Sequence, residues 1–220
     1  NMKNIKKTIF VIIYYFLYNT LIYAPFALLN FEFEDIPIIY NIIMQVVFIL
    51  SLIYIYKNDL KSHLDDFKKN AYDHLKIGFN CWLVGSFAMI VSNIIINAFS
   101  PLKLPENEQV VRQLLDTNTI YMIFSAVIVA PIIEETLFRK VIFDLTKNKN
   151  WFVIISGVLF GASHIIGSAE SFYSWLYIIP YTSLGIAFAY ILKKTNNPLP
   201  SIIMHSIHNL ITILQILLIL

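Results

Sequence analysis

Seven long stretches of this chain are dominated by apolar residues, and this feature limits the possible fold more than any other. They cover residues 8–30, 36–56, 77–99, 119–143, 151–167, 172–192 and 199–220. A helix needs about 20 predominantly apolar residues to cross a bilayer, and most of these stretches reach that length. Because the stretches are continuously apolar and do not alternate, they favour membrane-spanning helices over the strands of a β-barrel.

The composition supports the same conclusion. Of the 220 residues, 58% are hydrophobic and only 14% are charged, whereas a soluble domain usually has about 25% charged residues. The sequence therefore predicts an all-α, polytopic membrane helical bundle with about seven transmembrane helices. A net charge of +2 does not favour a nucleic-acid partner. The single cysteine, Cys81, excludes an intramolecular disulfide.

The distribution of Lys and Arg predicts how the bundle is oriented. If the N-terminus is inside, 14 of the 16 basic residues lie in inner segments, and only Lys103 and Arg112 lie outside. Cytoplasmic loops carry the excess of basic residues in membrane proteins. We therefore expect a multi-pass protein of the plasma membrane with a cytoplasmic N-terminus and an external C-terminus.

Two connections between the spans are long enough to form structure of their own. Residues 57–76 are highly charged and are predicted to form a cytoplasmic helix that continues towards the third span. Residues 105–117 have the spacing of a short amphipathic helix lying on the outer surface. We expect one structural domain in two parts. Residues 1–118 hold the first three spans with these connections, and residues 119–220 form a four-helix catalytic core.

Ionisable side chains inside the apolar stretches occur in only three of the last four. Such side chains cost at least about 2.5 kcal/mol each on membrane-insertion scales, which makes each one a functional candidate. They belong to the strings EETLFR, FGASH and HSIHN. These strings contain the six candidate site residues, which are Glu134, Glu135, Arg139, His164, His205 and Asn209, and also His208.

Helical spacing separates the two adjacent glutamates. Glu135 and Arg139 stand four residues apart and can pair along one helix face. Glu134 has Phe138 at that distance and points about 100° away from Glu135. Glu135 is therefore the better candidate for a structural ion pair, and Glu134 is the freer acid or base.

Each of these residues also has an ordinary structural explanation. A single histidine in a membrane helix more often bonds to a neighbouring helix than it catalyses a reaction, and the pair of Glu135 with Arg139 can be purely structural. His205 and Asn209, however, share a helix face. A free glutamate together with two histidines and this asparagine is harder to explain by packing alone. We therefore expect a shared polar site among the last four spans.

The three strings follow the order EExxxR, FxxxH and HxxxN on apolar segments. This pattern resembles the CPBP family of intramembrane proteases, which includes type II CAAX prenyl endopeptidases and bacterial Abi proteins linked to bacteriocin processing. The resemblance covers about residues 119–215 and implies hydrolysis of a peptide bond within or beside the membrane. It matches Glu134 to the catalytic glutamate of the family and His164 to its partner. His205 and Asn209 match the remaining site residues.

Two mechanisms are open at this point. In the first, Glu134 and His164 hold and deprotonate a water molecule, and Glu134 returns the proton to the leaving amine. His205 and Asn209 then donate hydrogen bonds to the developing oxyanion. In the second, a zinc ion is held by Glu134, His164 and His205, with water in the fourth position. We favour the first mechanism, in which no cofactor is bound.

The expected partners are the lipid bilayer and a peptide or protein substrate with a hydrophobic segment. The many Ile, Lys and Asn residues indicate an AT-rich bacterial genome, which favours a bacteriocin or signalling-peptide precursor as substrate. Two other functions fit the same residues. One is a non-catalytic membrane scaffold or sensor of the same fold. The other is a small transporter or proton relay, which predicts a repeat symmetry that the sequence lacks.

Overall fold

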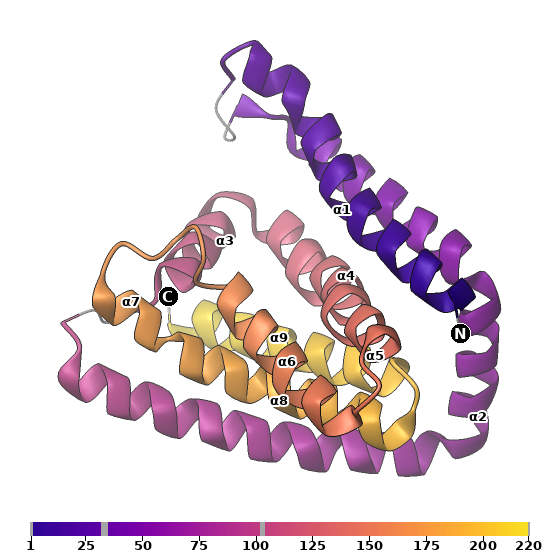
Figure 1. Cartoon of the computed structure of the whole chain (residues 1–220). Helices are drawn as coiled ribbons and strands as arrows, with labels where there is room; N and C mark the ends of the chain where they lie inside the picture. The colour runs from indigo at the N-terminus through magenta and orange to yellow at the C-terminus, as the bar shows by residue number, and fades with distance from the viewer. Residues whose placement is uncertain (1, 32–34, 102–103, 220) are drawn as a thin grey trace.

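The computed structural model describes residues 2–31, 35–101 and 104–219, and it consists of helices joined by short turns (Figure 1). No strand occurs within these residues. The predicted fold class, an all-α bundle with long apolar helices, is confirmed. Lys103, which enters the charge argument, lies outside the described residues.

Helix α1 (Met2–Leu28) and the first arm of α2 (Ile38–Phe99) form an antiparallel hairpin that leans away from the other helices (Figure 1). The ring of Phe48 is buried between them. Its centroid lies 5.4 Å from that of Tyr14, 5.8 Å from that of Tyr15 and 4.9 Å from that of Tyr18. This aromatic cluster holds the hairpin together, because large rings bury much apolar area and pack in preferred geometries.

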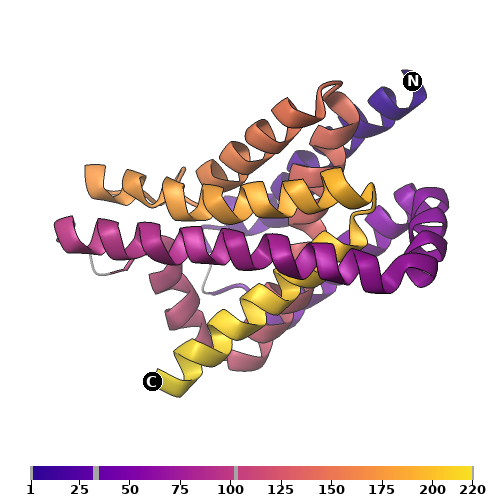
Figure 2. The same ribbon diagram turned by 90° about the horizontal axis from the view of Figure 1, so that it is seen from below.

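Helices α6 (Lys149–Ser163), α8 (Ile178–Thr195) and α9 (Leu199–Ile219) form the second part of the bundle. Figure 2 shows that α8 runs beside the second arm of α2, while α9 crosses both at an angle. Helices α6 and α8 meet at glycines. A Cβ atom on Gly157 would lie 2.5 Å from Ile186, and one on Gly161 would lie 2.2 Å from Thr182. Larger residues would therefore push the two helices apart.

Helix α2 is too long for a single crossing. Its 62 residues would extend about 90 Å if they were straight, and the hydrocarbon core of a bilayer is about 30 Å thick. The helix bends at Asn70, where φ is −119° and ψ is 22°. The predicted spans 36–56 and 77–99 and the predicted helix 57–76 are therefore parts of one bent helix.

A buried asparagine ties this bend to the turn between α8 and α9. The side-chain amide of Asn197 donates to the backbone oxygen of His63 at 2.7 Å and to Asp66 Oδ2 at 2.8 Å. Asn70 donates to the other oxygen of Asp66 at 2.9 Å. The hydrogen bond from Asn197 holds the pKa of Asp66 below its usual range. The charged connection is thus fixed in place by specific polar contacts.

Residues 106–145 form a helical run that changes type along its length. Its parts are α3 (Glu106–Phe124), the π-helical η2 (Ser125–Val129), α4 (Ala130–Glu134), the π-helical η3 (Glu135–Val141) and α5 (Ile142–Leu145). Helix α3 is interrupted at Asn118, where φ is −147° and ψ is 59°. The predicted helix 105–117 lies before this break. Its Leu115 packs against Ile213 and Ile216, so its apolar face covers α9 within the protein.

The predicted number of seven spans is not confirmed. In the described part of the chain, five segments are long and apolar enough to cross a membrane, and one of them is α2 with its two arms. Helix α6 corresponds to the predicted span 151–167 but has 15 residues, or about 22 Å. It is shorter than the hydrocarbon core. Five to six crossing segments are therefore supported.

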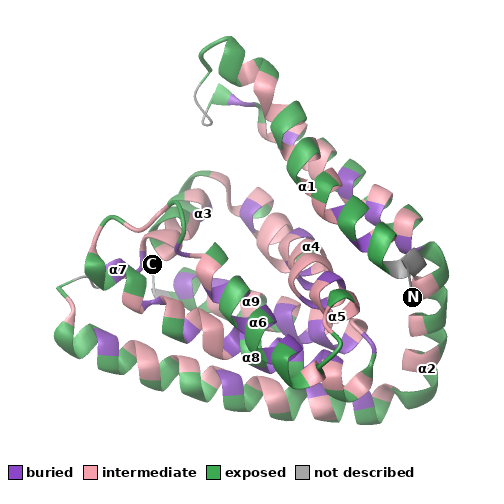
Figure 3. Cartoon of the chain, in the orientation of Figure 1, coloured by how far each residue is buried: buried purple, intermediate pink, exposed green. Residues whose placement is uncertain are grey.

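The outward faces of the helices carry large apolar side chains (Figure 3). On α1, Phe16 is 64% exposed and Leu21 is 67% exposed, and on the second arm of α2 Val84 and Phe87 are 71% and 70% exposed. Exposed apolar area of this extent is uncommon on soluble monomers. These surfaces suit contact with lipid chains.

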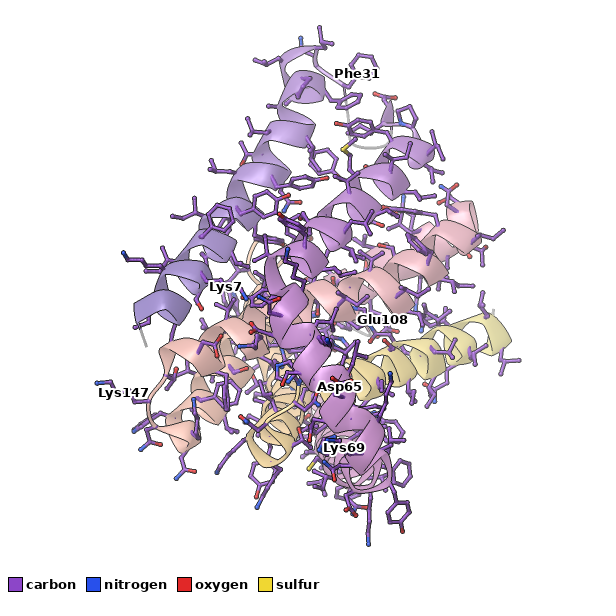
Figure 4. All side chains as sticks on the ribbon, turned by 90° about the vertical axis from the view of Figure 1, so that its right-hand side faces the viewer. Lys7, Phe31, Asp65, Lys69, Glu108 and Lys147 are labelled. Atoms are coloured by element: carbon purple, nitrogen blue, oxygen red, sulfur yellow. The ribbon has the colours of Figure 1, made fainter. Side chains whose placement is uncertain are left out.

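The segments predicted to be cytoplasmic meet at one end of the bundle. Lys7 pairs with Asp59 at 2.7 Å, which joins the start of α1 to α2. Lys193 donates to Asn150 at 2.5 Å, which joins the end of α8 to the start of α6. Figure 4 shows Phe31 at the far end of the α1–α2 hairpin from Lys7.

This clustering gives a topology prediction. Reporter fusions at Lys147 and Lys194 should have cytoplasmic activity, because basic segments are retained on that side. A fusion after Leu220 should report an external position. Paired alkaline phosphatase and green fluorescent protein fusions measure this directly. A cytoplasmic signal from the fusion after Leu220 would contradict the predicted orientation.

Candidate active site

The predicted ion pair between Glu135 and Arg139 exists and is fully buried. Both side chains are 0% exposed, and Arg139 Nε lies 3.2 Å from Glu135 Oε2. The guanidinium carbon lies 4.2 Å from the ring centroid of Phe160, and Nη2 donates to the backbone oxygen of Gly185 at 3.5 Å. The carboxylate, the aromatic face and the carbonyl oxygen all stabilise a positive charge at this position.

Helix α9 supplies two further partners of Glu135. Ser201 donates a hydrogen bond to Oε2, and His205 Nδ1 lies 2.9 Å from Oε1. The ring of Phe188 stacks on His205, with 4.8 Å between centroids and 20° between planes. Both carboxylate oxygens of Glu135 are therefore engaged within the protein, which suits a residue that holds the helices together.

Glu134 has a different environment from its neighbour. Its side chain is 26% exposed, and its Oε2 lies 3.8 Å from His205 Nε2, which is beyond hydrogen-bond distance. Within the described residues, this buried oxygen has no hydrogen-bond partner. The predicted contrast between the two glutamates is thus present in the geometry, because Glu135 is fixed and Glu134 faces open space.

That open space is a cavity of about 410 Å³ between α2, α3, α4, α6, α8 and α9. One wall is apolar and includes Met89, Leu184 and Ile213. The polar part of the wall contains Glu134, His164, His205, His208 and Asn209. The structure therefore brings together, around one cavity, every predicted site residue except the buried pair of Glu135 and Arg139.

His164 is held at the end of α6. Its Nδ1 lies 2.9 Å from the backbone oxygen of Phe160. A carbonyl oxygen can only accept a hydrogen bond, so Nδ1 carries the proton and Nε2 of the neutral ring has a free lone pair. The ring also stacks on Tyr181, with 4.5 Å between centroids. These contacts orient His164 as a base or hydrogen-bond acceptor towards the cavity.

Asn209 has a structural contact that the sequence did not indicate. Ala130 N–H donates to Ser125 O, five residues back, instead of to Ala126 O. The next residue that could reach Ala126 O in a π-helical pattern is Pro131, which has no N–H. Asn209 Nδ2 donates to Ala126 O at 2.8 Å. The side chain thus replaces a missing helical hydrogen bond and uses one of its two N–H groups to do so.

Replacing Asn209 by alanine should therefore destabilise the protein. An unpaired buried carbonyl costs about 1–3 kcal/mol, so we expect a loss of that size in the free energy of unfolding. Thr212→Val on the same helix is the control, because Thr212 donates only to its own helix at His208 O. Denaturation in detergent measures both variants. Equal stability of the two would show that the contact with Ala126 contributes nothing.

Several residues of the site were not predicted. Ser201 lies four residues before His205 and shares its helix face, so spacing could have identified it. Tyr181, which stacks on His164, has no such signal. Trp82 Nε1 donates to His208 Nδ1 at 3.3 Å, and this contact joins residues 126 positions apart. His208 therefore has the hydrogen-bonding role that its structural explanation suggests.

The zinc alternative finds no support in this arrangement. Within the residues that the structure describes, no three His, Cys, Asp or Glu side chains are placed to hold a metal ion. A catalytic zinc ion needs three protein ligands at about 2 Å from one point. His205 Nδ1 is instead bonded to Glu135, and its Nε2 is 3.8 Å from Glu134. The side chains as placed do not fit a zinc ion.

Comparison with known proteins adds independent information. Residues 116–211 match the family model described as type II CAAX prenyl endopeptidase Rce1-like. This segment belongs to the Rce1-like family. The resemblance found in the three strings is confirmed, and all six predicted site residues lie inside this Rce1-like domain.

Two curated proteins are related to parts of the chain. The first is the UPF0177 protein YxdF of Lactococcus lactis subsp. lactis (strain IL1403), which is 39% identical over 83 residues, or 38% of this chain and 43% of that protein. The second is named "Putative membrane peptidase YdiL", from Bacillus subtilis (strain 168). It is 30% identical over 113 residues, or 50% of this chain and 43% of that protein. The chain thus spans less than half the length of either relative. No solved structure matches it.

Proposed function

We propose that the Rce1-like domain is a membrane-embedded peptidase that hydrolyses a peptide bond with Glu134 as its acid and base. One observation carries this proposal. Glu134, His164, His205 and Asn209 line a single cavity, and Glu134 alone of the two adjacent glutamates faces it. A carboxylate beside an open space, with an oriented histidine across from it, is suited to activating a water molecule.

The proposed reaction uses these groups in a fixed order. A water molecule lies between Glu134 and the free Nε2 of His164, and Glu134 removes its proton as the oxygen attacks the peptide carbonyl carbon. The proton then passes from Glu134 to the leaving amine nitrogen, and the carbon–nitrogen bond breaks. Proton transfer by a positioned side chain typically contributes about 100–10,000-fold to the rate.

His205 and Asn209 are proposed to stabilise the oxyanion. His205 is fixed through Nδ1 by Glu135, and in its protonated form it can donate from Nε2 towards the cavity. Asn209 retains one N–H beyond its contact with Ala126. Two donors aimed at the developing negative charge are the usual arrangement for stabilising a tetrahedral intermediate.

The cavity also limits the class of substrate. Its apolar wall, with Met89, Leu184 and Ile213, suits a peptide with a hydrophobic segment that reaches the site from the membrane. We propose a bacterial peptide precursor of the bacteriocin or signalling type as the substrate and the plasma membrane as the place of action. The YdiL name is in keeping with a peptidase.

The proposal is tested with purified protein in lipid nanodiscs and a panel of synthetic leader peptides that carry apolar segments. Mass spectrometry should find products with new termini, and nanodiscs purified without the protein should give none. We expect cleavage to persist in a preparation stripped with a strong chelator and shown by elemental analysis to be free of metal. Activity that disappears on stripping and returns with added zinc would replace the metal-free mechanism with a zinc-dependent one.

A further inference from the structure

A second cavity lies on the other side of Glu134. It has a volume of about 210 Å³ and is enclosed by the α1–α2 hairpin on one side and by η2 and α4 on the other. Its lining is rich in hydroxyl and amide groups, which come mainly from Tyr15, Tyr18, Asn19, Gln45 and Ser125. Such a concentration of polar groups inside a membrane bundle is costly unless it serves a function.

The two cavities meet at the proposed catalytic carboxylate. Ser125, Ala130 and Glu134 line both of them. Glu134 therefore lies in the wall between a large cavity with an apolar side and a smaller polar one. Neither His164, His205 nor Asn209 lines the second cavity, so its contact with the proposed catalytic groups is through Glu134 alone.

The hydrogen bonding in this region calls for an additional donor. Gln45 donates to Ser125 Oγ at 3.0 Å and to Tyr121 at 3.3 Å, but its own Oε1 is buried without a partner within the described residues. Glu134 Oε2 is in the same state. Buried acceptors are normally satisfied. A water molecule has two donors and is the smallest group that can satisfy such oxygens.

Polar contacts continue from this cavity towards the end of the hairpin. Tyr23, which lines the cavity, donates to Asn41 at 3.0 Å, and Asn41 is only 3% exposed. These groups lie on the side of the hairpin that leads away from Lys7 and towards Phe31 (Figure 4). The polar groups therefore form a continuous path from Glu134 towards one end of the molecule.

We propose that the second cavity is an aqueous compartment that supplies water to Glu134. This inference rests on the proposed function, in which each cleavage consumes one water molecule. A peptide bound in the larger cavity excludes water from that side, so the water must reach the carboxylate from elsewhere. A volume of 210 Å³ holds several water molecules, since each occupies about 30 Å³ in the liquid.

The test measures water in the cavity and needs no substrate. In a Cys81→Ala background, a single cysteine is placed in the cavity wall as Asn19→Cys or Met44→Cys. Matched controls are Leu17→Cys and Leu21→Cys, which bracket Asn19 on α1 and are 54% and 67% exposed on its outer face. For Met44, the control is Ile43→Cys, which is 47% exposed. All variants are labelled in nanodiscs with a small, water-soluble methanethiosulfonate.

We expect both cavity cysteines to react at least about tenfold faster than their controls, because each unit by which apolar surroundings raise a thiol pKa removes nine-tenths of the reactive thiolate. Equal, slow labelling at both pairs would overturn the proposal. Having two cavity positions guards against one variant that fails to fold. Because labelling is independent of cleavage, a protein with a labelled cavity but no peptidase activity would refute the proposed function and leave the aqueous compartment standing.

Discussion

Glu135→Gln is expected to lower the free energy of unfolding by about 3–5 kcal/mol, because removing one partner of a buried ion pair leaves the other charge uncompensated. Arg139 is 0% exposed, and its remaining neighbours would be the ring of Phe160 and the carbonyl of Gly185. The same change weakens the contacts that Ser201 and His205 make with this carboxylate. Chemical denaturation in detergent, followed by circular dichroism, measures the effect.

The chain offers a matched control for this substitution. Glu108 and Arg112 have the same residue types and the same spacing, with 2.7 Å between Arg112 Nη2 and Glu108 Oε1. Their side chains are 30% and 26% exposed, however. Exposed pairs of this kind contribute only about 0–1 kcal/mol, so Glu108→Gln should have a small effect. Similar losses in the two variants would mean that burial of the Glu135–Arg139 pair does not set its contribution.

His164→Ala is expected to reduce the cleavage rate by about 100–10,000-fold, the usual contribution of a positioned proton-transfer partner. The substitution removes the Nε2 lone pair that faces the cavity. Its effect on folding should be small, because His164 makes its hydrogen bond through Nδ1 to Phe160 of the same helix. Initial rates on a cleaved leader peptide measure the effect.

Ser163→Ala is the control for His164. Ser163 is the preceding residue, and its hydroxyl donates to Phe160 O at 2.8 Å, within its own helix. The variant should cleave at nearly the wild-type rate. If His164→Ala is folded and retains more than about a tenth of wild-type activity, the histidine has no role in proton transfer.

The sequence was sufficient to predict the contacts that depend on spacing within one helix. The pairing of Glu135 with Arg139 follows from their four-residue separation, and so does the different environment of Glu134. The all-helical membrane fold follows from the long apolar segments. These features are local, so a single stretch of sequence contains the information that specifies them.

Contacts between distant segments could not be predicted in the same way. The bond from Asn209 to Ala126 depends on a π-helical stretch whose pattern is set by Pro131 and by packing against α9. The contact between Trp82 and His208 depends on how the second arm of α2 lies beside the site. The number of spans was overestimated because hydropathy could show neither that α6 is short nor that α2 is one bent helix.

The central claim is that the carboxylate of Glu134 performs the chemistry. The measurement that tests it most directly is the cleavage rate of wild type, Glu134→Gln and Glu134→Asp on one peptide, with each rate corrected for folded protein. Glutamine keeps the shape but cannot exchange a proton, so its rate should fall at least about 100-fold, whereas aspartate should retain measurable activity. A folded Glu134→Gln variant that cleaves as fast as Glu134→Asp would contradict the account.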